Sequence, residues 1–217
     1  MLAVVIDCAT AAVTAAVADL GGPVEVLSER VVVDARAHGE LLAPGIDAAL
    51  REAGVRPRDL TAVVAGVGPG PFTGLRVGLV TAAALTDSLN LPGYGVSTLD
   101  AFGWAVPGRV LVATDARRRE VYWAVYEDGV RLTGPAVGAP ATLPLPDGVG
   151  AAVGDGALRY ADVLSMPVLD SPRYPPAAGL AALAADRVRD KAPSEPLTPL
   201  YLRRPDAVPP AGRKAVS

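Results

Sequence analysis

The segment "LAVVIDCATAAVTAAVADLG" (residues 2–21) has the same pattern as "VLVATDARRREVYWAVYEDG" (residues 110–129), and our prediction of the fold begins from this pair of segments. Aligned without a gap, the two segments place Asp7 on Asp115, Val13 on Val121 and Val17 on Val125. Each reads as a β-branched strand that ends at an acid, a short polar turn and a second strand. Any two hairpins can align in this way, but the shared aspartate and the equal spacing favour an internal duplication.

In the residues that surround the first copy, the spacing of apolar residues alternates between the period of a strand and that of a helix. Strands are expected over residues 2–7, 12–19, 23–33, 60–68 and 93–96, and helices over 37–54, from the loop at 66–76 to about 89, and over 98–106. Pro44 either interrupts the first helix or opens a new first turn. The order β-β-β-α-β-α-β-α predicts one half of an actin-like (ribonuclease H-like) α/β fold. With the duplication, we expect two lobes.

The chain divides by composition into three parts. Residues 1–106 form the first expected lobe, residues 107–204 a smaller, loop-rich second lobe, and residues 205–217 a disordered tail. Within the second lobe, the Pro- and Gly-rich residues 133–150 predict a loop-dominated connection, and residues 177–190 a helix. The segment 195–206 is expected to be extended.

Bulk composition excludes several classes of protein. The 217 residues carry a net charge of −3, so no global basic field is available to bind nucleic acid. A single cysteine excludes an internal disulfide, and a single histidine, His38, leaves too few ligands for a typical zinc site. The first residues lack the basic region of a signal peptide, and no apolar run has membrane-spanning length. We therefore expect a soluble, cytoplasmic protein that does not bind membranes.

The loop "GVGPGPFTGLR" (residues 66–76) raises the question of a phosphate-binding turn. It lacks the lysine of the Walker pattern and fails the dinucleotide pattern G-x-G-x-x-G, and Pro69 and Pro71 have no N–H to donate. A structural cause is more economical: Thr73 is predicted as the N-cap of a helix that Gly74 opens. The small residues Gly74, Gly78 and Ala82 then form a stripe that packs on the chain's own sheet or on a partner helix.

Several segments in order resemble the TsaB (YeaZ) family over nearly the whole chain. They are "IDCAT", "HGELLAPGIDAAL", "GVGPGPFTGLRVG", "LPGYGVSTLDAF", "DARRREVYW", "GDG" and "YLR". The loop is the most specific segment, with the motif residues Gly68, Pro69, Gly70, Phe72, Thr73, Gly74 and Arg76. The resemblance implies an actin-like fold of two lobes and a supporting role beside a larger catalytic paralogue, TsaD, and a small ATPase, TsaE.

That complex attaches a threonylcarbamoyl group to the adenosine beside the tRNA anticodon. By resemblance, ATP and a metal are used by the partner subunits, and tRNA is reached only through the complex. The catalytic relative has two metal-binding histidines in the segment that reads "GVSTLDAF" here, and Thr98 and Phe102 stand in their places. Neither residue type replaces a histidine ligand. We therefore expect a non-catalytic subunit with no metal or cofactor of its own.

Two departures from the family pattern bear on nucleotide binding. Cys8 and Ala9 replace the usual Thr-Ser after the first acid, and Pro71 replaces the usual Ser of the loop. Asp7 and Thr10 remain as candidates for a vestigial nucleotide site. Arg117, Arg118 and Arg119 are expected in a solvated hairpin turn, with a tRNA contact inside the complex as the alternative.

The family uses the first two long helices to contact its paralogue. We therefore expect a partner interface, and a homodimer in the absence of the paralogue. The residues assigned to it are His38, Leu41, Leu42, Ile46, Leu50, Gly74, Gly78 and Ala82. The alternative function is a free-standing actin-like ATPase or phosphotransferase, or a metallopeptidase-like enzyme. The loop-like second half, and the lack of a metal cluster or usable catalytic triad, argue against it.

Overall fold

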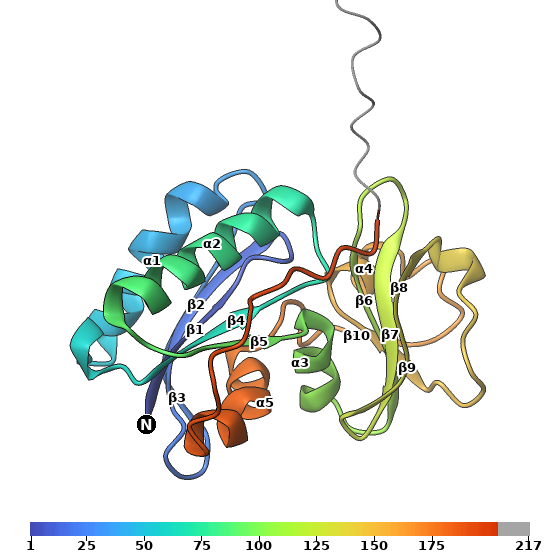
Figure 1. Ribbon diagram of the computed structural model, residues 1–217. Coiled ribbons are helices and arrows are strands. Elements are labelled where there is room, and N and C mark those ends of the chain that lie inside the picture. Colours follow the sequence, from blue (N-terminus) through green and yellow to red (C-terminus); the bar gives the residue numbers. More distant parts are fainter. Residues whose placement is uncertain (204–217) are drawn as a thin grey trace, which may run out of the picture.

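The computed structural model describes residues 1–203, which form two lobes, each built on a five-stranded mixed sheet (Figure 1). The first sheet has the order β3-β2-β1-β4-β5 and the second the order β10-β9-β6-β7-β8. The first contains β1 (Leu2–Asp7), β2 (Ala12–Asp19), β3 (Glu25–Val33), β4 (Ala62–Gly66) and β5 (Gly93–Val96). The second contains β6 (Arg109–Asp115), β7 (Val121–Glu127), β8 (Val130–Gly138), β9 (Ala151–Val153) and β10 (Val168–Leu169).

The two sheets share one topology. In each, the first strand is antiparallel to the second and parallel to the fourth, and Asp7 and Asp115 each end the first strand. The β1–β2 and β6–β7 pairs are the two copies that the sequence aligned. The actin-like α/β expectation is therefore confirmed.

Two long helices cover one face of the first sheet, α1 (His38–Glu52) and α2 (Phe72–Leu89). Leu42, Ile46 and Leu75 from these helices join Val4 and Ile6 of β1 in one buried cluster. Burial of such side chains, worth about 1.5–3 kcal/mol each, is what fixes the helices on the sheet. Pro44 lies exposed inside α1, which passes through it without a break. It therefore neither ends the helix nor starts one.

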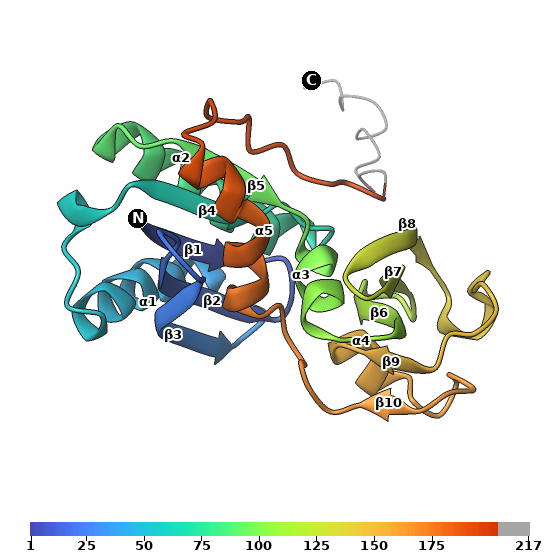
Figure 2. The same ribbon diagram turned by 90° about the horizontal axis from the view of Figure 1, so that it is seen from below.

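The helix that follows each sheet in the sequence packs on the sheet of the other lobe. Helix α3 (Thr98–Ala105) follows the first sheet but packs on the second through Leu99 and Phe102. Helix α5 (Ala177–Arg189) follows the second sheet but packs on the first through Leu180 and Ala184. Figures 1 and 2 show the two helices side by side between the lobes. The domain boundary between residues 106 and 107 remains a prediction. Helix α5 belongs to the second half of the chain but packs on the first lobe.

The second lobe differs most from its sequence-based description. Residues 133–138, expected in a loop, belong to the edge strand β8, which contains Gly134 and Pro135. An edge strand tolerates proline because its outer N–H groups need no ladder partner. Gly134 lies so close to β7 that a Cβ there would approach the carbonyl oxygen of Trp123 to 2.8 Å. The short helix α4 (Asp155–Arg159) and the 3₁₀ turns η1 (Pro57–Asp59) and η2 (Pro140–Thr142) complete the elements.

The C-terminal segment, which was expected to be extended, crosses the first lobe without regular secondary structure. The Glu195 N–H donates to the Gly93 carbonyl at 3.0 Å and the Leu200 N–H to the Val67 carbonyl at 2.8 Å. The first bond covers the open edge of β5, and the second holds the segment to the residue that follows β4. The expected tail, residues 205–217, lies outside the described residues. Among the residues described, none of the helices has the length and apolarity needed to cross a membrane.

Candidate functional site

The glycines of the loop at residues 66–76 allow close packing against the end of β1. A Cβ at Gly66 would lie 1.7 Å from Asp7 Oδ2, and one at Gly70 would lie 2.1 Å from the Ala9 carbonyl oxygen. The Gly68 N–H donates to Thr98 Oγ1 at 3.1 Å, so it is already used inside the protein. With Pro69 and Pro71 lacking N–H groups, the loop has few donors left for a phosphate.

Helix α2 begins two residues earlier than the sequence predicted, at Phe72 instead of Gly74. Pro71 occupies the N-cap position, and its carbonyl accepts the Leu75 N–H at 3.1 Å. Thr73 lies exposed in the first turn and makes no side-chain cap bond, so its assignment as N-cap is wrong. The fixed φ of proline, −58° here, orients the chain into the helix without a capping hydroxyl.

The small-residue stripe of α2 faces its own sheet. A Cβ at Gly74 would lie 2.7 Å from the Cys8 carbonyl oxygen, and one at Gly78 would lie 3.2 Å from Cys8 Cβ. Ala82 is fully buried in the same cluster. The sequence left open whether the stripe packs on the chain's own sheet or on a partner helix. In the structure it packs on the chain's own sheet.

The α1 residues assigned to the interface also point inward, except for one. Leu42, Ile46 and Leu50 are buried in the core, whereas Leu41 is half-buried at its margin. His38 is only 7% exposed, and its Nε2–H donates to the Thr10 carbonyl at 2.9 Å. These buried side chains hold the helix pair on the sheet, and apolar periodicity alone could not distinguish that role from a partner contact.

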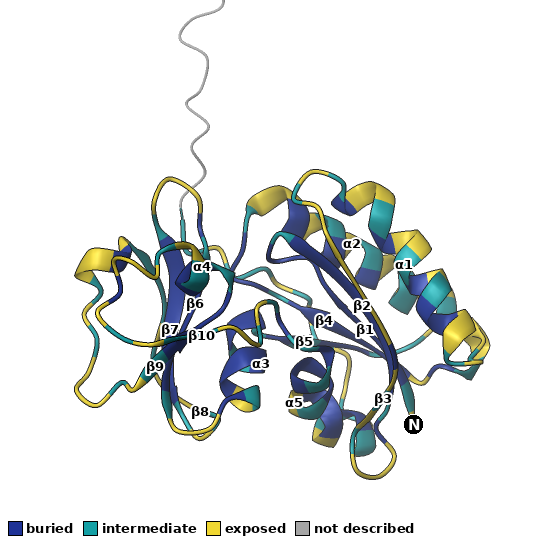
Figure 3. Cartoon of the chain, turned by 180° about the vertical axis from the view of Figure 1, so that it is seen from behind, coloured by how far each residue is buried: buried dark blue, intermediate teal, exposed yellow. Residues whose placement is uncertain are grey.

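The sides of α1 and α2 that are turned away from the sheet are exposed (Figure 3), and several of the residues there are apolar. Val80 is 67% exposed, Pro44 and Ala84 are exposed, and Leu41 and Val77 are half-buried. We call these five residues the outer helical face. Phe72, 48% exposed, lies at the start of the same helix. Exposed aliphatic groups on one helix pair are a candidate for a protein-binding surface.

The candidate nucleotide residues are engaged within the first lobe. Asp7 is 1% exposed, and its carboxylate accepts the Thr98 hydroxyl at 2.6 Å and the Ala9 N–H at 2.8 Å. Burial raises its pKa to about 6 against these hydrogen bonds, which lower it. Thr10 is 4% exposed, and its hydroxyl accepts the Ala12 N–H at 3.2 Å. A nucleotide would reach either side chain only by breaking such bonds.

Thr98 and Phe102, which the family resemblance places where a catalytic relative is expected to have histidines, serve the packing of the lobes. Thr98 is fully buried on Asp7, and Phe102 is fully buried in the core of the second sheet. Neither side chain fits a metal, because a hydroxyl already bonded to a carboxylate and a phenyl ring offer it no ligand. Within residues 1–203, no three His, Cys, Asp or Glu side chains gather as a metal site.

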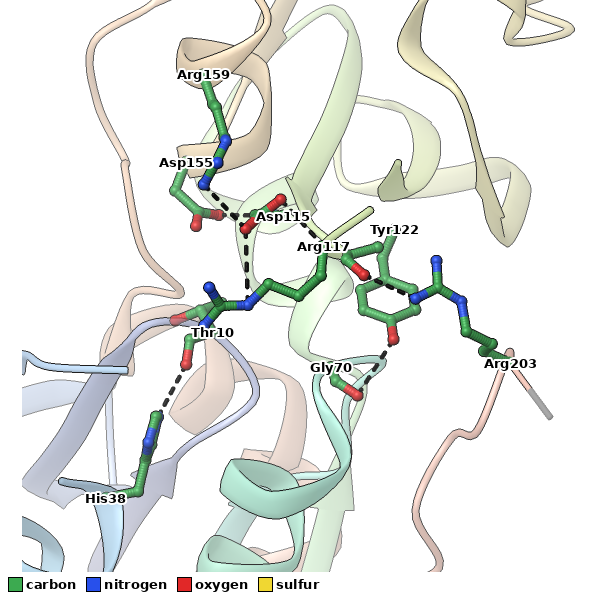
Figure 4. A network of polar contacts seen from close by, with 10 residues as sticks. Thr10, His38, Gly70, Asp115, Arg117, Tyr122, Asp155, Arg159 and Arg203 are labelled. Carbon is green, nitrogen blue, oxygen red and sulfur yellow. Dashed lines mark hydrogen bonds and ion pairs between the residues drawn. The ribbon is translucent and has the colours of Figure 1, made fainter. Parts of the chain in front are cut away.

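A cleft of about 540 Å³ opens between the lobes, and charged residues line it in opposite pairs. Asp115 Oδ2 lies 3.3 Å from Arg159 Nη1 and 3.9 Å from Arg117 Nε (Figure 4). Asp155 accepts the Asp115 N–H at 3.4 Å, and burial, together with the Asp115 charge, raises its pKa to about 6. With Arg173 and Asp170 also on its walls, the cleft has balanced charge rather than the positive field that a polyphosphate needs.

The arginine turn between β6 and β7 has an uncommon backbone. Arg117, Arg118 and Arg119 have φ values of 62°, 55° and 62°, in the left-handed region that non-glycine residues seldom adopt. Contacts between distant segments hold the turn. Arg203 donates to the Ala116 carbonyl at 3.0 Å and pairs with Glu120. The turn propensity of these residues predicted a turn. Nothing in the sequence indicated its left-handed backbone or the contacts that Arg203 makes with it.

Comparisons with known proteins agree with the geometry. Residues 25–167 match the family model described as TsaD: tRNA N6-adenosine threonylcarbamoyltransferase. An uncharacterized protein of Mycobacterium tuberculosis (strain H37Rv) is 52% identical over 204 residues, which are 94% of this chain and 92% of that protein. The tRNA threonylcarbamoyladenosine biosynthesis protein TsaB of Escherichia coli (strain K12) is 41% identical over 97 residues, 42% of each chain. The solved structure of YeaZ from Pseudomonas aeruginosa covers 93% of this chain and 99% of its own, with TM-score 0.75 and 27% identity.

Proposed function

Because the chain belongs to the TsaB/YeaZ group of the TsaD-type threonylcarbamoyltransferase family, we propose that it supports N6-threonylcarbamoyladenosine formation in tRNA as a non-catalytic subunit. In this role it binds a TsaD-type catalytic paralogue in the cytoplasm and assembles with a TsaE-type ATPase. The tRNA adenosine beside the anticodon is modified by the paralogue. This chain contacts tRNA only as part of the complex, where the turn at Arg117 to Arg119 is the local basic element.

The outer helical face is the observation that carries this proposal. Its central residue, Val80, exposes 67% of its surface, whereas the neighbouring Leu79 is buried at 6%. A docked helix pair from the paralogue covers these aliphatic groups, and their burial contributes about 25 cal/mol per Å². The buried residues of the stripe act indirectly, because Gly74 and Gly78 set α2 close to the sheet and thereby fix the position of Val80. In the absence of the paralogue, the same face pairs with a second copy of the chain.

The non-catalytic role is supported by the chemistry of the positions that match the paralogue's ligands. Thr98 is a hydrogen-bond donor to Asp7, and Phe102 is a core residue. Asp7 and Thr10 use their polar atoms inside the lobe. The transfer chemistry, the metal and the ATP therefore belong to the partners in this proposal.

Co-expression with a TsaD-type and a TsaE-type subunit of the same organism tests the proposal. We expect Val80→Glu and Ala84→Glu to abolish co-purification with the paralogue and to lower the modified nucleoside in tRNA. Val130→Glu is the matched control, because Val130 is 66% exposed on β8 of the other lobe. If both α2 variants bind and support modification as well as the control does, the docking face is elsewhere. Modification by this chain without the paralogue would overturn the non-catalytic role.

A further inference from the structure

A groove of about 540 Å³ lies alongside the outer helical face, between α2 and the C-terminal segment. One wall is formed by Leu79, Val80 and Ala83 of α2, and the other by Leu197, Pro199 and Tyr201. Val80 belongs to both surfaces, so the groove continues the outer helical face without a break. The C-terminal segment, which follows α2 in the sequence by more than 100 residues, thus supplies half of a surface that α2 alone cannot form.

The groove is formed before any partner arrives, because its outer wall is fixed at several points. The Gly93 N–H donates to Ser194 Oγ at 3.0 Å, and Arg187 pairs with Glu195 at 2.7 Å. At the other end, the Tyr201 ring stacks on Phe72 with centroids 5.5 Å apart. A preformed wall loses little conformational entropy when a ligand binds.

Of the charged residues that line the groove, the acid is paired and the arginine is not paired with an acid within residues 1–203. Glu195 is paired with Arg187, so its charge is compensated. Arg76 is exposed, with its guanidinium 4.1 Å above the Phe72 ring and its Nε–H donated to Tyr201 Oη at 3.1 Å. A guanidinium has five N–H donors, so this one retains donors for an incoming carboxylate. The occupant that matches is an aliphatic side chain followed by an acid.

We infer that this groove receives an aliphatic side chain and a neighbouring carboxylate from the partner helix that docks on the outer helical face. The inference rests on the proposed function, and it makes the C-terminal segment part of the binding site rather than only a cover for β5. Tyr201 and Arg76 then act together: the Tyr201 hydroxyl accepts the Arg76 Nε–H and holds the guanidinium over the Phe72 ring, where it faces the partner.

The test measures the affinity of the purified chain for the purified TsaD-type paralogue of the same organism. Ala83→Trp fills the groove from an exposed helical position, and we expect at least a tenfold rise in Kd. Arg76→Met keeps the apolar stem and removes the charge, and we expect a severalfold rise in Kd with a weaker dependence on salt. Val130→Trp on β8 is the control and should leave Kd unchanged. Melting temperatures within about 2 °C of the unmodified chain show that the variants are folded.

The outcomes separate the two proposals. If Ala84→Glu abolishes binding while Ala83→Trp and Arg76→Met leave Kd unchanged, the groove is not part of the interface and this inference is wrong, although the docking face stands. If none of the three changes Kd, both the inference and the docking face are wrong. Loss of binding by Ala84→Glu, together with the expected rises in Kd for Ala83→Trp and Arg76→Met, supports both.

Discussion

The Thr98 hydroxyl donates a 2.6 Å hydrogen bond to Asp7 Oδ2, and this contact joins the end of β1 to the start of α3. Thr98 Oγ1 also accepts the Gly68 N–H at 3.1 Å. One buried hydroxyl therefore connects the first strand, the glycine loop and the helix that crosses to the second lobe. Where the catalytic relative is expected to bind a metal, this chain has an internal structural contact.

Replacing Thr98 by Val should destabilise the protein by about 2–3 kcal/mol. Valine has nearly the same shape, but it leaves the buried Asp7 carboxylate without its side-chain donor and Gly68 N–H without an acceptor. Urea unfolding at pH 7.5 measures the change. Thr98→Ser, which keeps the hydroxyl, is the control and should lose much less. Equal stability of the Val and Ser variants would show that the hydrogen bonds contribute little.

Asp7 should also make the stability of the fold depend on pH. Its pKa is raised by burial from 3.8 to about 6, so the folded protein holds the proton to a higher pH than the unfolded chain. The contribution is favourable below about pH 4, and about 3 kcal/mol is lost as the pH rises to 6 and above. Asp155, whose pKa is raised in the same way, adds a parallel loss.

Asp7→Asn isolates the contribution of Asp7 from that of Asp155. Its amide cannot titrate, so the free energy of unfolding relative to the unmodified chain should change with pH between 4 and 6 and be constant outside that interval. Denaturant unfolding at half-unit pH steps gives the difference curve. A flat difference across the whole range would mean that Asp7 titrates normally in the folded protein.

The loop glycines should be sensitive to a single methyl group. Gly70→Ala places a Cβ 2.1 Å from the Ala9 carbonyl oxygen, which forces a backbone shift and should cost about 2–3 kcal/mol. Gly39→Ala, on the exposed side of α1 with nothing within 4 Å of the new Cβ, should leave stability unchanged or raise it by up to about 1 kcal/mol. Thermal unfolding of the two variants separates the effects. A Gly70→Ala protein as stable as Gly39→Ala would contradict the packing role of the loop.

Much of the fold could be predicted because its main signals are local. The β-branched runs at residues 2–7 and 110–115 form the central strands of the two sheets, and the repeated Asp7 and Asp115 end them as the alignment required. The helical period placed α1 and α2 correctly. The third strand of the second lobe was missed because its glycine and proline, Gly134 and Pro135, carry the composition of a loop, whereas an edge position tolerates them.

The arrangement of side chains at the site could not be predicted, since it depends on contacts between distant segments. Asp7 and Thr98 meet across the lobe only when α3 crosses over to the second sheet. The spacing of small residues in α2 identified its packing face correctly. It could not predict that this face covers Cys8, or that Val80 is exposed on the other side. The groove beside α2 needs Tyr201, which no local pattern relates to Phe72.

Cys8 should report how tightly α2 is held on the sheet. Its thiol is 1% exposed, and burial raises its pKa well above the usual range, so the folded protein should not react with a thiol-specific disulfide reagent at pH 8. Gly78→Ala brings a Cβ to 3.2 Å from Cys8 Cβ, and we expect the resulting loss of about 1–2 kcal/mol to speed labelling roughly tenfold or more. Gly22→Ala, whose new Cβ meets nothing within 4 Å, should label as slowly as the unmodified chain. Rapid labelling of the unmodified chain would show that α2 separates readily from β1, and the glycine stripe could then not fix the position of Val80.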